Sequence, residues 1–241
     1  MITGRRQGNK QMDIPIVSIV IPAYNEEKTI EEILARTNKT METIGLPYDI
    51  TVVDDGSLDR TRLLAERNKA TVLTNGRNSG KGHALRRGFQ NATGNIIITI
   101  DADGSHKPEE IPKLLKTLLN GADIVAGSRF LGNREKDSVR KLNVIGNHLF
   151  NLLILLLTRK RITDSQTGFR AFKKKVLQEI RMTSEGYEIE TELTMKTLRN
   201  GYLLQEEPIT CEKRRDGNSH LNPLRDGLKI LKNIVKASIF E

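Results

Sequence analysis

Hydrophobic residues follow two alternating spacings in the first part of the chain. Short β-branched runs, which are typical of buried strands, occupy residues 17–21, 48–53, 70–73, 95–100 and 123–126. Between these runs, apolar residues recur at helical spacing over 26–43, 80–92 and 108–120. Strands that alternate with helices across short connections predict a mainly parallel α/β sheet flanked by helices.

The pattern changes after residue 127. Residues 141–157 are amphipathic at first and then heavily apolar, and residues 162–173 are typical of a loop followed by a strand. The remaining elements that the pattern predicts are a helix over 188–200, a strand over 203–211 and a helix over 224–235. We therefore expect the end of the chain to be largely helical.

The length of the chain sets the expected domain organisation. A chain of 241 residues can bury one good hydrophobic core, and no internal repeat divides it. We therefore expect a single domain over residues 14–241, with a first half at 14–127 and a second half at 128–241. Residues 1–13 are polar and unpatterned, and we expect them to form a disordered leader.

Polar clusters follow three of the predicted strands. They are Tyr24-Asn25-Glu26, Asp54-Asp55 and Asp101-Ala102-Asp103. In a parallel α/β sheet, ligands bind beyond the carboxyl ends of the strands. Three clusters on one edge of the sheet therefore predict one binding site there.

Asp101 and Asp103 are the strongest candidates for metal binding. Two carboxylates that are two residues apart at the end of a strand can converge, and such hard oxygen ligands suit Mg²⁺ or Mn²⁺ bound to a diphosphate. A metal at this place offsets the charge on a nucleoside-diphosphate leaving group. The alternative is a solvated turn in which the aspartates cap a helix.

Two further motifs could either bind a ligand or have an ordinary structural role. Asp54 can accept a hydrogen bond from a base or a ribose hydroxyl, although Asp-Gly is also a common turn. The run from Asn78 to Gly82 contains Lys81 but lacks the full phosphate-loop pattern, because Gly82 follows the lysine. We reject a phosphate loop and keep Lys81 as a candidate phosphate contact.

Charge and composition narrow the class of partner. The net charge is +9, which indicates an anionic partner, and basic residues cluster at 159–161, 173–175 and 213–215. Aromatic residues make up only 4% of the chain, Trp is absent, and no nucleic-acid-binding motif is present, so we expect no nucleic acid partner. Surface lysines without a specific partner are the alternative.

The sequence also predicts the redox state of the protein's compartment and whether a segment could cross a membrane. Cys211 is alone, which excludes an internal disulfide and suits a reducing compartment. No basic-then-apolar leader opens the chain, so we expect no signal peptide. The richest apolar run, 149–157, has about half of the roughly 20 residues that a spanning helix needs.

At this point the ordered motifs resemble a known family. The segments 17–26, 52–57, 78–82 and 101–103 occur in the order that is typical of family-2 glycosyltransferases of GT-A fold. The segments Gly127-Ser-Arg-Phe130, Asp164-Ser-Gln-Thr-Gly-Phe-Arg170 and Arg214-Arg-Asp-Gly-Asn-Ser219 are similar to the branch of dolichyl-phosphate mannose or glucose synthases. The resemblance covers about residues 16 to 233, and it implies a Rossmann-like, mainly parallel central sheet.

The resemblance implies roles in the first half, 14–127, which would bind the nucleotide sugar. Residues Pro22, Tyr24, Glu26 and Asp54 would line the nucleoside pocket. Asp101 and Asp103 would face the diphosphate, with Asp103 as the stronger candidate for direct metal contact. Members of the family often carry Gln two residues after the second Asp. Here Ser105, a shorter oxygen ligand, would complete the Mn²⁺ or Mg²⁺ site.

The resemblance also implies roles in the second half, 128–241, which would bind the acceptor. Arg129 and Arg140 would meet the phosphate of a lipid. Arg214 would contact the donor phosphates as a catalytic residue when a loop closes, since guanidinium groups bind phosphate bidentately. The residues Gly217-Asn-Ser219 would give that loop its mobility.

The reaction implied is a single inverting displacement. An oxygen of polyprenyl (dolichyl) phosphate attacks the anomeric carbon of a GDP- or UDP-hexose from the face opposite the nucleotide. Because a phosphate is already anionic at pH 7, little general-base help is needed. If the acceptor were a glycan or protein hydroxyl, a base would be required, and Glu188, Glu190 and Glu192 are candidates.

We expect the enzyme to be cytoplasmic and peripheral on the cytoplasmic face of the membrane. Residues 149–157 with the basic cluster at 159–161 are typical of interfacial attachment. The alternatives are a helix packed in the core or a dimer contact, and the partner could include a separate membrane subunit or a second copy. Other functional readings are a sugar-1-phosphate nucleotidyltransferase and a catalytically silent nucleotide-binding regulator. The sequence does not rank GDP-mannose, UDP-glucose and UDP-N-acetylglucosamine.

Overall fold

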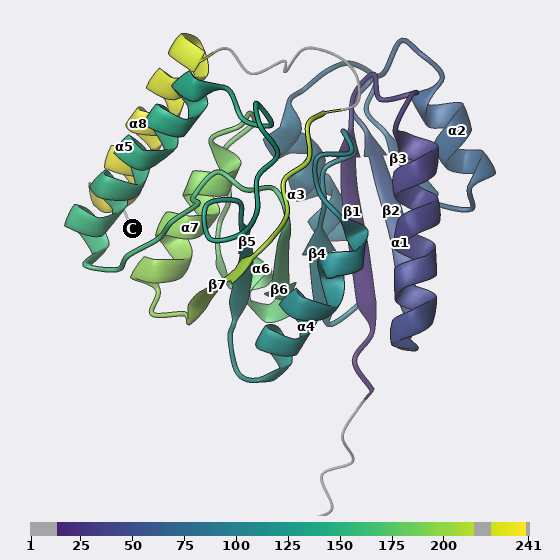
Figure 1. Ribbon diagram of the computed structural model, residues 1–241, viewed down its shortest axis with the longest axis horizontal. Helices are drawn as coiled ribbons and strands as arrows, with labels where there is room; N and C mark the ends of the chain where they lie inside the picture. Colours follow the sequence, from purple (N-terminus) through teal and green to yellow (C-terminus); the bar gives the residue numbers. More distant parts are fainter. Residues whose placement is uncertain (1–13, 215–222, 240–241) are drawn as a thin grey trace, which may run out of the picture.

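The computed structural model describes residues 14–214 and 223–239, and these residues form one seven-stranded sheet in the order β3-β2-β1-β4-β6-β5-β7 (Figure 1). The strands are β1 (Val17–Ala23), β2 (Tyr48–Asp54), β3 (Thr71–Thr74), β4 (Ile96–Thr99), β5 (Ile124–Ser128), β6 (Arg170–Lys173) and β7 (Leu204–Pro208). The predicted mainly parallel α/β sheet is confirmed.

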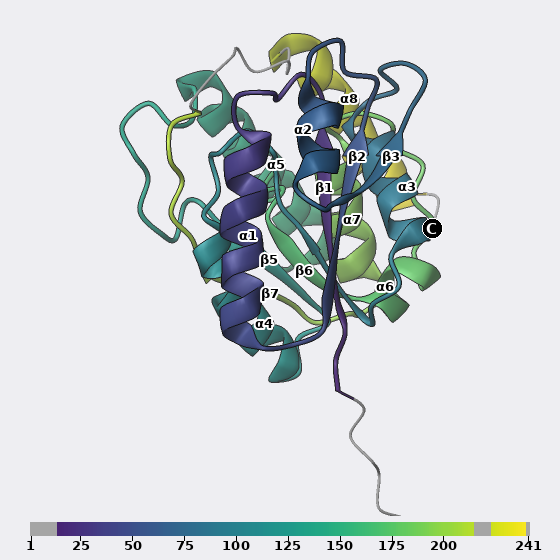
Figure 2. The same cartoon turned by 90° about the vertical axis from the view of Figure 1, so that its right-hand side faces the viewer.

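Helices cover both faces of the sheet. They are α1 (Ile30–Ile44), α2 (Thr61–Arg67), α3 (Lys81–Asn91), η1 (Pro108–Glu110), α4 (Ile111–Leu119), α5 (Lys141–Thr158), α6 (Lys174–Glu179), α7 (Ile189–Arg199) and α8 (Pro223–Ile239). Figure 2 shows α1 and α4 on one side of the sheet and α3 and α6 on the other. The result is a three-layer arrangement.

Strand direction explains where the site lies. β1 pairs in parallel with both β2 and β4, so the carboxyl ends of these three strands meet at one edge of the sheet. β6 runs antiparallel to both β4 and β5, while β7 is again parallel to β5. The sequence pattern did not reveal that the direction reverses at β6.

Two hydrophobic clusters fill the space between the sheet and its helices. Alternate residues of β1 face opposite ways: Ile19 and Ile21 pack with α1 and α4, whereas Val20 packs with α3. This alternation is what a strand buried on both faces requires. It explains the uninterrupted apolar runs that marked the strands in the sequence.

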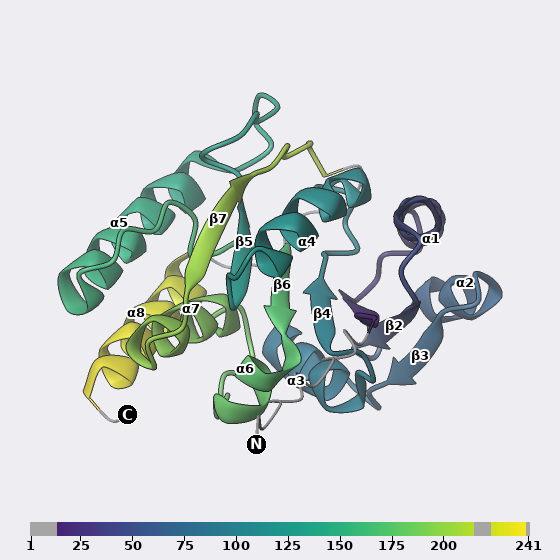
Figure 3. The same cartoon turned by 90° about the horizontal axis from the view of Figure 1, so that it is seen from below.

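A third cluster joins α5, α7 and α8 beyond the β7 edge of the sheet. Its buried residues include Phe150 and Ile154 of α5 with Ile230 and Ile234 of α8. Figures 1 and 3 show α5 and α8 side by side there. The 18-residue α5 is long and apolar enough to cross a membrane by length and composition alone, with mean hydropathy 1.3, although 22% of it is buried against the domain.

Element boundaries depart from the sequence prediction in three places. The first helix begins at Ile30 rather than near Glu26, because the carbonyl of Glu26 accepts hydrogen bonds from the amides of Thr29 and Ile30 in a turn. The last strand ends at Pro208, which cannot donate to a sheet. The short helix α6 was not predicted, since its six residues are too few for a periodic pattern.

Candidate functional site

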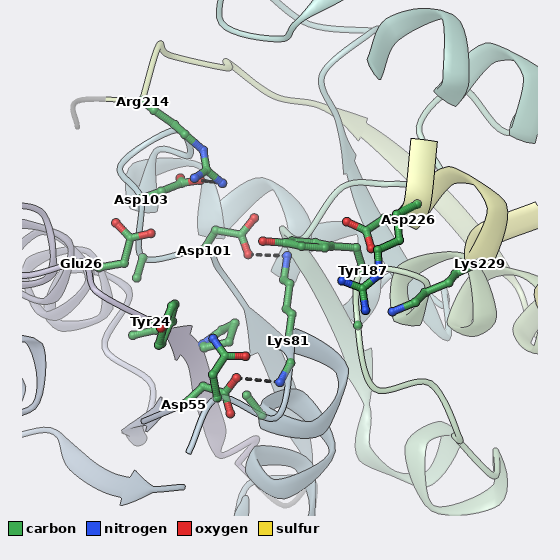
Figure 4. Close-up of a pocket in the computed structure, with 18 residues that line it drawn as sticks. Tyr24, Glu26, Asp55, Lys81, Asp101, Asp103, Tyr187, Arg214, Asp226 and Lys229 are labelled. Carbon is green, nitrogen blue, oxygen red and sulfur yellow. Dashed lines mark hydrogen bonds and ion pairs between the residues drawn. The ribbon is translucent and has the colours of Figure 1, made fainter. Parts of the chain in front are cut away.

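A cavity of about 380 Å³ opens at the edge where β1, β2 and β4 end (Figure 4). Its walls come from the turns after these strands, from the start of α3, from the segment before α7 and from α8. The lining residues are Pro22, Ala23, Tyr24, Glu26, Asp55, Asn78, Gly80, Lys81, Ala84, Asp101, Ala102, Asp103, Gly186, Tyr187, Arg214, Arg225, Asp226 and Lys229. The polar clusters of the sequence therefore do gather at one edge.

The turn after β1 is held by the loop after β2. Asn25 adopts a left-handed conformation with φ 55°, its side chain accepts from the amide of Leu58, and its own amide donates to the hydroxyl of Ser57. The amide of Glu26 donates to the hydroxyl of Thr61 at 2.7 Å. These cross-links fix the positions from which Tyr24 and Glu26 enter the cavity.

Of the two aspartates at the end of β2, only one lines the cavity. Asp54 accepts from the amide of Ser57 at 3.1 Å, and it is not among the cavity-lining residues in the described part of the chain. Its neighbour Asp55 lines the cavity and accepts from the amides of Ser79 and Gly80. Of these two carboxylates, the structure therefore brings Asp55 to the cavity, whereas the sequence analysis assigned the nucleoside contact to Asp54.

Asp101 points at the partly buried Lys81. Its Oδ1 lies 2.7 Å from Nζ of Lys81, which also lies 2.7 Å from Oε1 of Glu190 in α7. Burial alone would raise the pKa of Asp101, but Lys81 more than offsets it and holds that pKa well below its usual range. Lys81 thus forms a charged bridge between the first half of the chain and the second.

Asp103 is paired with the predicted donor-phosphate arginine. Its Oδ2 lies 2.6 Å from Nη2 of Arg214, and its Oδ1 accepts from the amide of Ser105. Ser105 lines the neighbouring cavity with both aspartates. The other residues of the predicted loop, Gly217 and Ser219, lie outside the described residues.

The carboxylates of the site suit a divalent metal that also binds a diphosphate. Among residues 14–214 and 223–239, no three His, Cys, Asp or Glu side chains are already arranged to hold a metal. A cation of the Mg²⁺ type commonly takes one or two protein carboxylates and completes its shell with phosphate oxygens and water. Asp101 and Asp103 fit that use, and the Arg214 guanidinium already sits as a cation on Asp103.

The charges near Asp103 perturb Glu26 and His106. Burial raises the pKa of Glu26 to about 7, and the negative charge of Asp103 adds to the effect. His106 is buried, stacks on Phe169 with ring centroids 5.5 Å apart, and lies 3.8 Å from Oδ2 of Asp101. Burial lowers the pKa of His106, which therefore stands as a neutral ring beside the carboxylates.

A second cavity, of about 250 Å³, adjoins the first and is strongly basic. Arg129, Arg140 and Lys213 line it, and it shares Lys81 and Arg214 with the first cavity. Both arginines that were predicted to meet an acceptor phosphate are thus brought to one place. The exposed Arg140 directly precedes the first residue of α5, and the amides of Asn143 and Val144 donate to its carbonyl.

Arg129 is held by a buried carboxylate. Its Nε and Nη2 donate to the two oxygens of Asp164 at 2.7 and 2.9 Å, and Asp164 is fully buried. This two-pronged pair engages one edge of the guanidinium and leaves Nη1 as the nitrogen for a ligand. Burial alone would lower the pKa of Arg129, but Asp164 raises it, so the charge is permanent.

Sequence reasoning missed two residues that line these cavities, Asp55 and Tyr187, and two that pair with lining residues, Asp164 and Glu190. Asp164 was part of a recognised motif, but nothing in its spacing to Arg129 reveals the pair. Tyr187 lines both cavities, and burial raises the pKa of its hydroxyl. Glu190 was considered only as a general base, because a buried partner 109 positions earlier in the chain leaves no local signal.

Comparison with protein families gives one clear match. Residues 18–181 match the model described as glycosyl transferase family 2, which is more than half of the chain. The matched segment contains every predicted site residue except Arg214. It agrees with the family predicted from the ordered motifs.

Named relatives and solved structures extend this result. The chain is 34% identical over 212 residues to a dolichol-phosphate mannosyltransferase of Pyrococcus furiosus, which covers 85% of this chain and 59% of that protein. It is 38% identical over 172 residues to an undecaprenyl-phosphate 4-deoxy-4-formamido-L-arabinose transferase of Pectobacterium carotovorum, covering 68% and 51%. The chain thus spans little more than half of the length of these two relatives.

A solved structure shares the fold. Glucosyl-3-phosphoglycerate synthase from Mycobacterium tuberculosis, crystallised with Mn²⁺, UDP and phosphoglyceric acid, superposes with a TM-score of 0.77 at 22% identity. The match covers 94% of this chain and 80% of that one. The predicted GT-A fold is confirmed by this likeness.

Proposed function

The chain belongs to glycosyl transferase family 2, and we propose that it moves a hexose from a nucleoside-diphosphate sugar to a polyprenyl phosphate with inversion at the anomeric carbon. The observation that carries the proposal is the junction of two cavities of different chemistry. Carboxylates outnumber basic side chains in the first, and basic side chains outnumber carboxylates in the second. The two cavities share Lys81, Asp101, Asp103, Tyr187 and Arg214.

The first cavity suits the nucleotide sugar. Tyr24 and Pro22 supply flat apolar surface, and Asp55 supplies carboxylate oxygens next to it. Asp101 and Asp103 would hold Mn²⁺ or Mg²⁺, which supplies charge stabilisation to the departing diphosphate when it is bound. Arg214 lies 2.6 Å from Asp103, and its guanidinium is therefore within reach of a diphosphate at the same carboxylates.

The second cavity suits the phosphate of the acceptor. Asp164 orients Arg129, and Arg140 adds a second guanidinium at the open side. Two arginines hold a phosphate in a fixed orientation, so one of its oxygens can approach the anomeric carbon in line. The protein mainly aligns the reactants and stabilises charge, because the phosphate needs no deprotonation at pH 7.

The surroundings of the three glutamates favour a phosphate over a hydroxyl acceptor. Glu188 accepts from the amide of Gly186, and Glu192 accepts from the amides of Thr183 and Ser184. Glu190 is buried against Lys81. Glu190 and Glu192 are therefore engaged in the charged bridge and in holding the segment before α7. Oε2 of Glu188 has no hydrogen-bond partner among the described residues, so a hydroxyl acceptor with Glu188 as its base is the second candidate.

We further propose that the protein attaches peripherally to the cytoplasmic face of the membrane. α5 exposes seven large apolar residues: Leu142, Ile145, Leu149, Leu152, Leu155, Leu156 and Leu157. No charged residue interrupts α5 after Lys141, and Arg159-Lys160-Arg161 follow it. An apolar helix face with adjacent basic residues is typical of interfacial binding, and the lone thiol of Cys211 fits a reducing compartment.

A transfer assay with separated phases tests the proposal. The protein, Mn²⁺ and each of GDP-mannose, UDP-glucose and UDP-N-acetylglucosamine with labelled sugar would be mixed with a polyprenyl phosphate in detergent micelles. We expect label to move into the organic phase with one of the donors and the product to have inverted configuration. If no donor gives organic-phase label while a glycan acceptor is modified, the second candidate is correct.

A further inference from the structure

A third cavity lies between the apolar helices and the two cavities of the site. It has a volume of about 120 Å³ and is enclosed by α5, α8 and the segment that precedes each of α5 and α7. Its lining is mixed. Leu142, Phe150 and Ile230 are among its apolar residues, and Lys81, Arg129 and Glu190 are its charged ones.

The third cavity is continuous with the phosphate-binding one. Both are lined by Arg129, Asn143 and Gln166, so they meet at the arginine proposed to hold the acceptor phosphate. Lys81 and Tyr187 line all three cavities and mark the point where they converge. A molecule with its phosphate at Arg129 and an apolar tail toward Phe150 would occupy both spaces at once.

Two helix glycines keep this cavity open. Gly146 lies within α5 and Gly227 within α8, and both line the cavity. A glycine in a helix costs about 1 kcal/mol relative to alanine, so local stability does not favour either residue. A side chain would nevertheless fit: an added Cβ at Gly146 would approach only Phe150, at 3.7 Å, and one at Gly227 would meet nothing within 4 Å.

We propose that this cavity binds the first isoprenoid unit of the acceptor, next to its phosphate. This inference rests on the proposed function and deepens it by assigning the place of the lipid tail. The volume is suitable, because an engineered apolar cavity of about 150 Å³ holds benzene, which has six carbons, and an isoprenoid unit has five. The cavity lies beside α5, whose outer face is proposed to contact the lipid surface from which the tail arrives.

The test fills the cavity without touching a charged group. Gly146→Leu and Gly227→Leu would each place a side chain in the cavity, and the matching alanine variants would fill it less. Lys232→Leu, which adds the same side chain at an exposed position of α8, is the control. The acceptor is a soluble phosphate ester with two isoprenoid units, so that no membrane or detergent is involved.

We expect the acceptor KM to rise at least tenfold in each leucine variant and less in each alanine variant. The Kd for the nucleotide should be unchanged, and the thermal stability should be equal to or above that of the wild type, since leucine is a better helix former than glycine. Lys232→Leu should behave as the wild type in all three measurements.

Two different results would overturn the assignment, and only one of them would also overturn the proposed function. If the wild type uses the isoprenoid phosphate and the folded leucine variants use it with the same KM, the tail lies elsewhere while the proposed function stands. If the wild type neither binds nor glycosylates any isoprenoid phosphate while it still binds a nucleotide sugar, the proposed function fails together with the assignment.

Discussion

Both halves of the chain have a buried apolar core, but they differ in how many charged side chains they bury and in how much apolar surface they expose. In residues 14–127, apolar side chains fill the interior, and the carboxylates collect at the strand ends. In the described residues after 127, charged side chains are buried in the interior, including Asp164, Arg170, Glu192 and Lys196. α5 and α8 bury some large apolar side chains in the third cluster, but they expose others, such as Leu149, Leu156 and Leu228.

This difference follows from what each half is proposed to bind. A nucleotide sugar is polar throughout, so a half with an ordinary core and a polar edge is sufficient. A lipid phosphate requires an anion site and an apolar surface within a short distance of each other. Burying paired charges costs desolvation energy, so these pairs are expected where orientation matters more than stability.

The largest expected effect tests the charge at the strand ends of the first half. Asp103→Asn keeps the shape of the side chain but removes the charge that pairs with Arg214 and would hold the metal. We expect transfer to fall at least about 100-fold, as when a main stabiliser of transition-state charge is lost. Steady-state kinetics with saturating Mn²⁺ checks this.

Glu42→Gln, a neutralised carboxylate on the exposed side of α1, is the control and should retain full activity. Wild-type rates for Asp103→Asn would contradict the metal role of Asp103.

The next effect concerns the buried pair of the second half. Asp164→Asn leaves the guanidinium of Arg129 buried without its counter-charge, which costs about 3 kcal/mol in comparable pairs. We expect a loss of that size in urea unfolding and an increase in acceptor KM with an unchanged Kd for the nucleotide.

The exposed pair Arg62–Glu66 of α2 provides the matched control. Removing its charge in Glu66→Gln should change stability by no more than about 0.5 kcal/mol. If both substitutions cost the same, the contrast between a polar edge and a charged interior is wrong.

A smaller effect is expected from the pH dependence of Glu26. Its pKa is raised from 4.5 to about 7 by burial, with Asp103 adding to the effect. Between pH 4.5 and 7 the folded protein therefore holds a proton that the unfolded chain releases. Glu26 lowers the free energy of unfolding least below pH 4.5, and this loss of stability grows as the pH rises toward 7. Glu26→Gln should remove a loss on the order of 2 kcal/mol between pH 5 and pH 8 in metal-free buffer.

Urea unfolding of both proteins at the two pH values measures this difference. An identical pH dependence in wild type and Glu26→Gln would mean that the carboxyl is ionised and solvated throughout. The charge crowding at the end of β1 would then be absent.

The smallest effect concerns the outer face of α5. Leu149 and Leu156 are exposed, and each should bury its side chain in a bilayer surface. Replacing either with Ser should weaken binding to anionic vesicles about tenfold, which corresponds to the loss of roughly 1.5 kcal/mol of apolar burial. Vesicle sedimentation at low salt measures the binding of each variant. High salt should weaken the binding of the wild type as well.

Leu119→Ser, on the exposed side of α4, is the control, because it removes an equally exposed leucine from a different surface. Equal binding by all the variants would indicate that α5 faces another protein chain rather than lipid.

The sequence predicted the first half better than the second for a physical reason. The strands and helices of the first half are local patterns, and the motifs at residues 101–103 and 22–26 lie where the strands end. The pairs Arg129–Asp164 and Lys81–Glu190 join residues far apart in the chain, so no local spacing indicates them. The antiparallel β6 and the choice between Asp54 and Asp55 likewise depend on tertiary packing.

The central claim is that the acceptor is a lipid phosphate that needs no base. The most direct measurement compares a polyprenyl phosphate with the corresponding free polyprenol in identical micelles, with the preferred donor and Mn²⁺, and follows organic-phase label. We predict rapid transfer to the phosphate and none to the alcohol, with Arg129→Ala abolishing the difference by losing phosphate transfer. Equal transfer to the alcohol would contradict the account, because the enzyme would then have to deprotonate its acceptor.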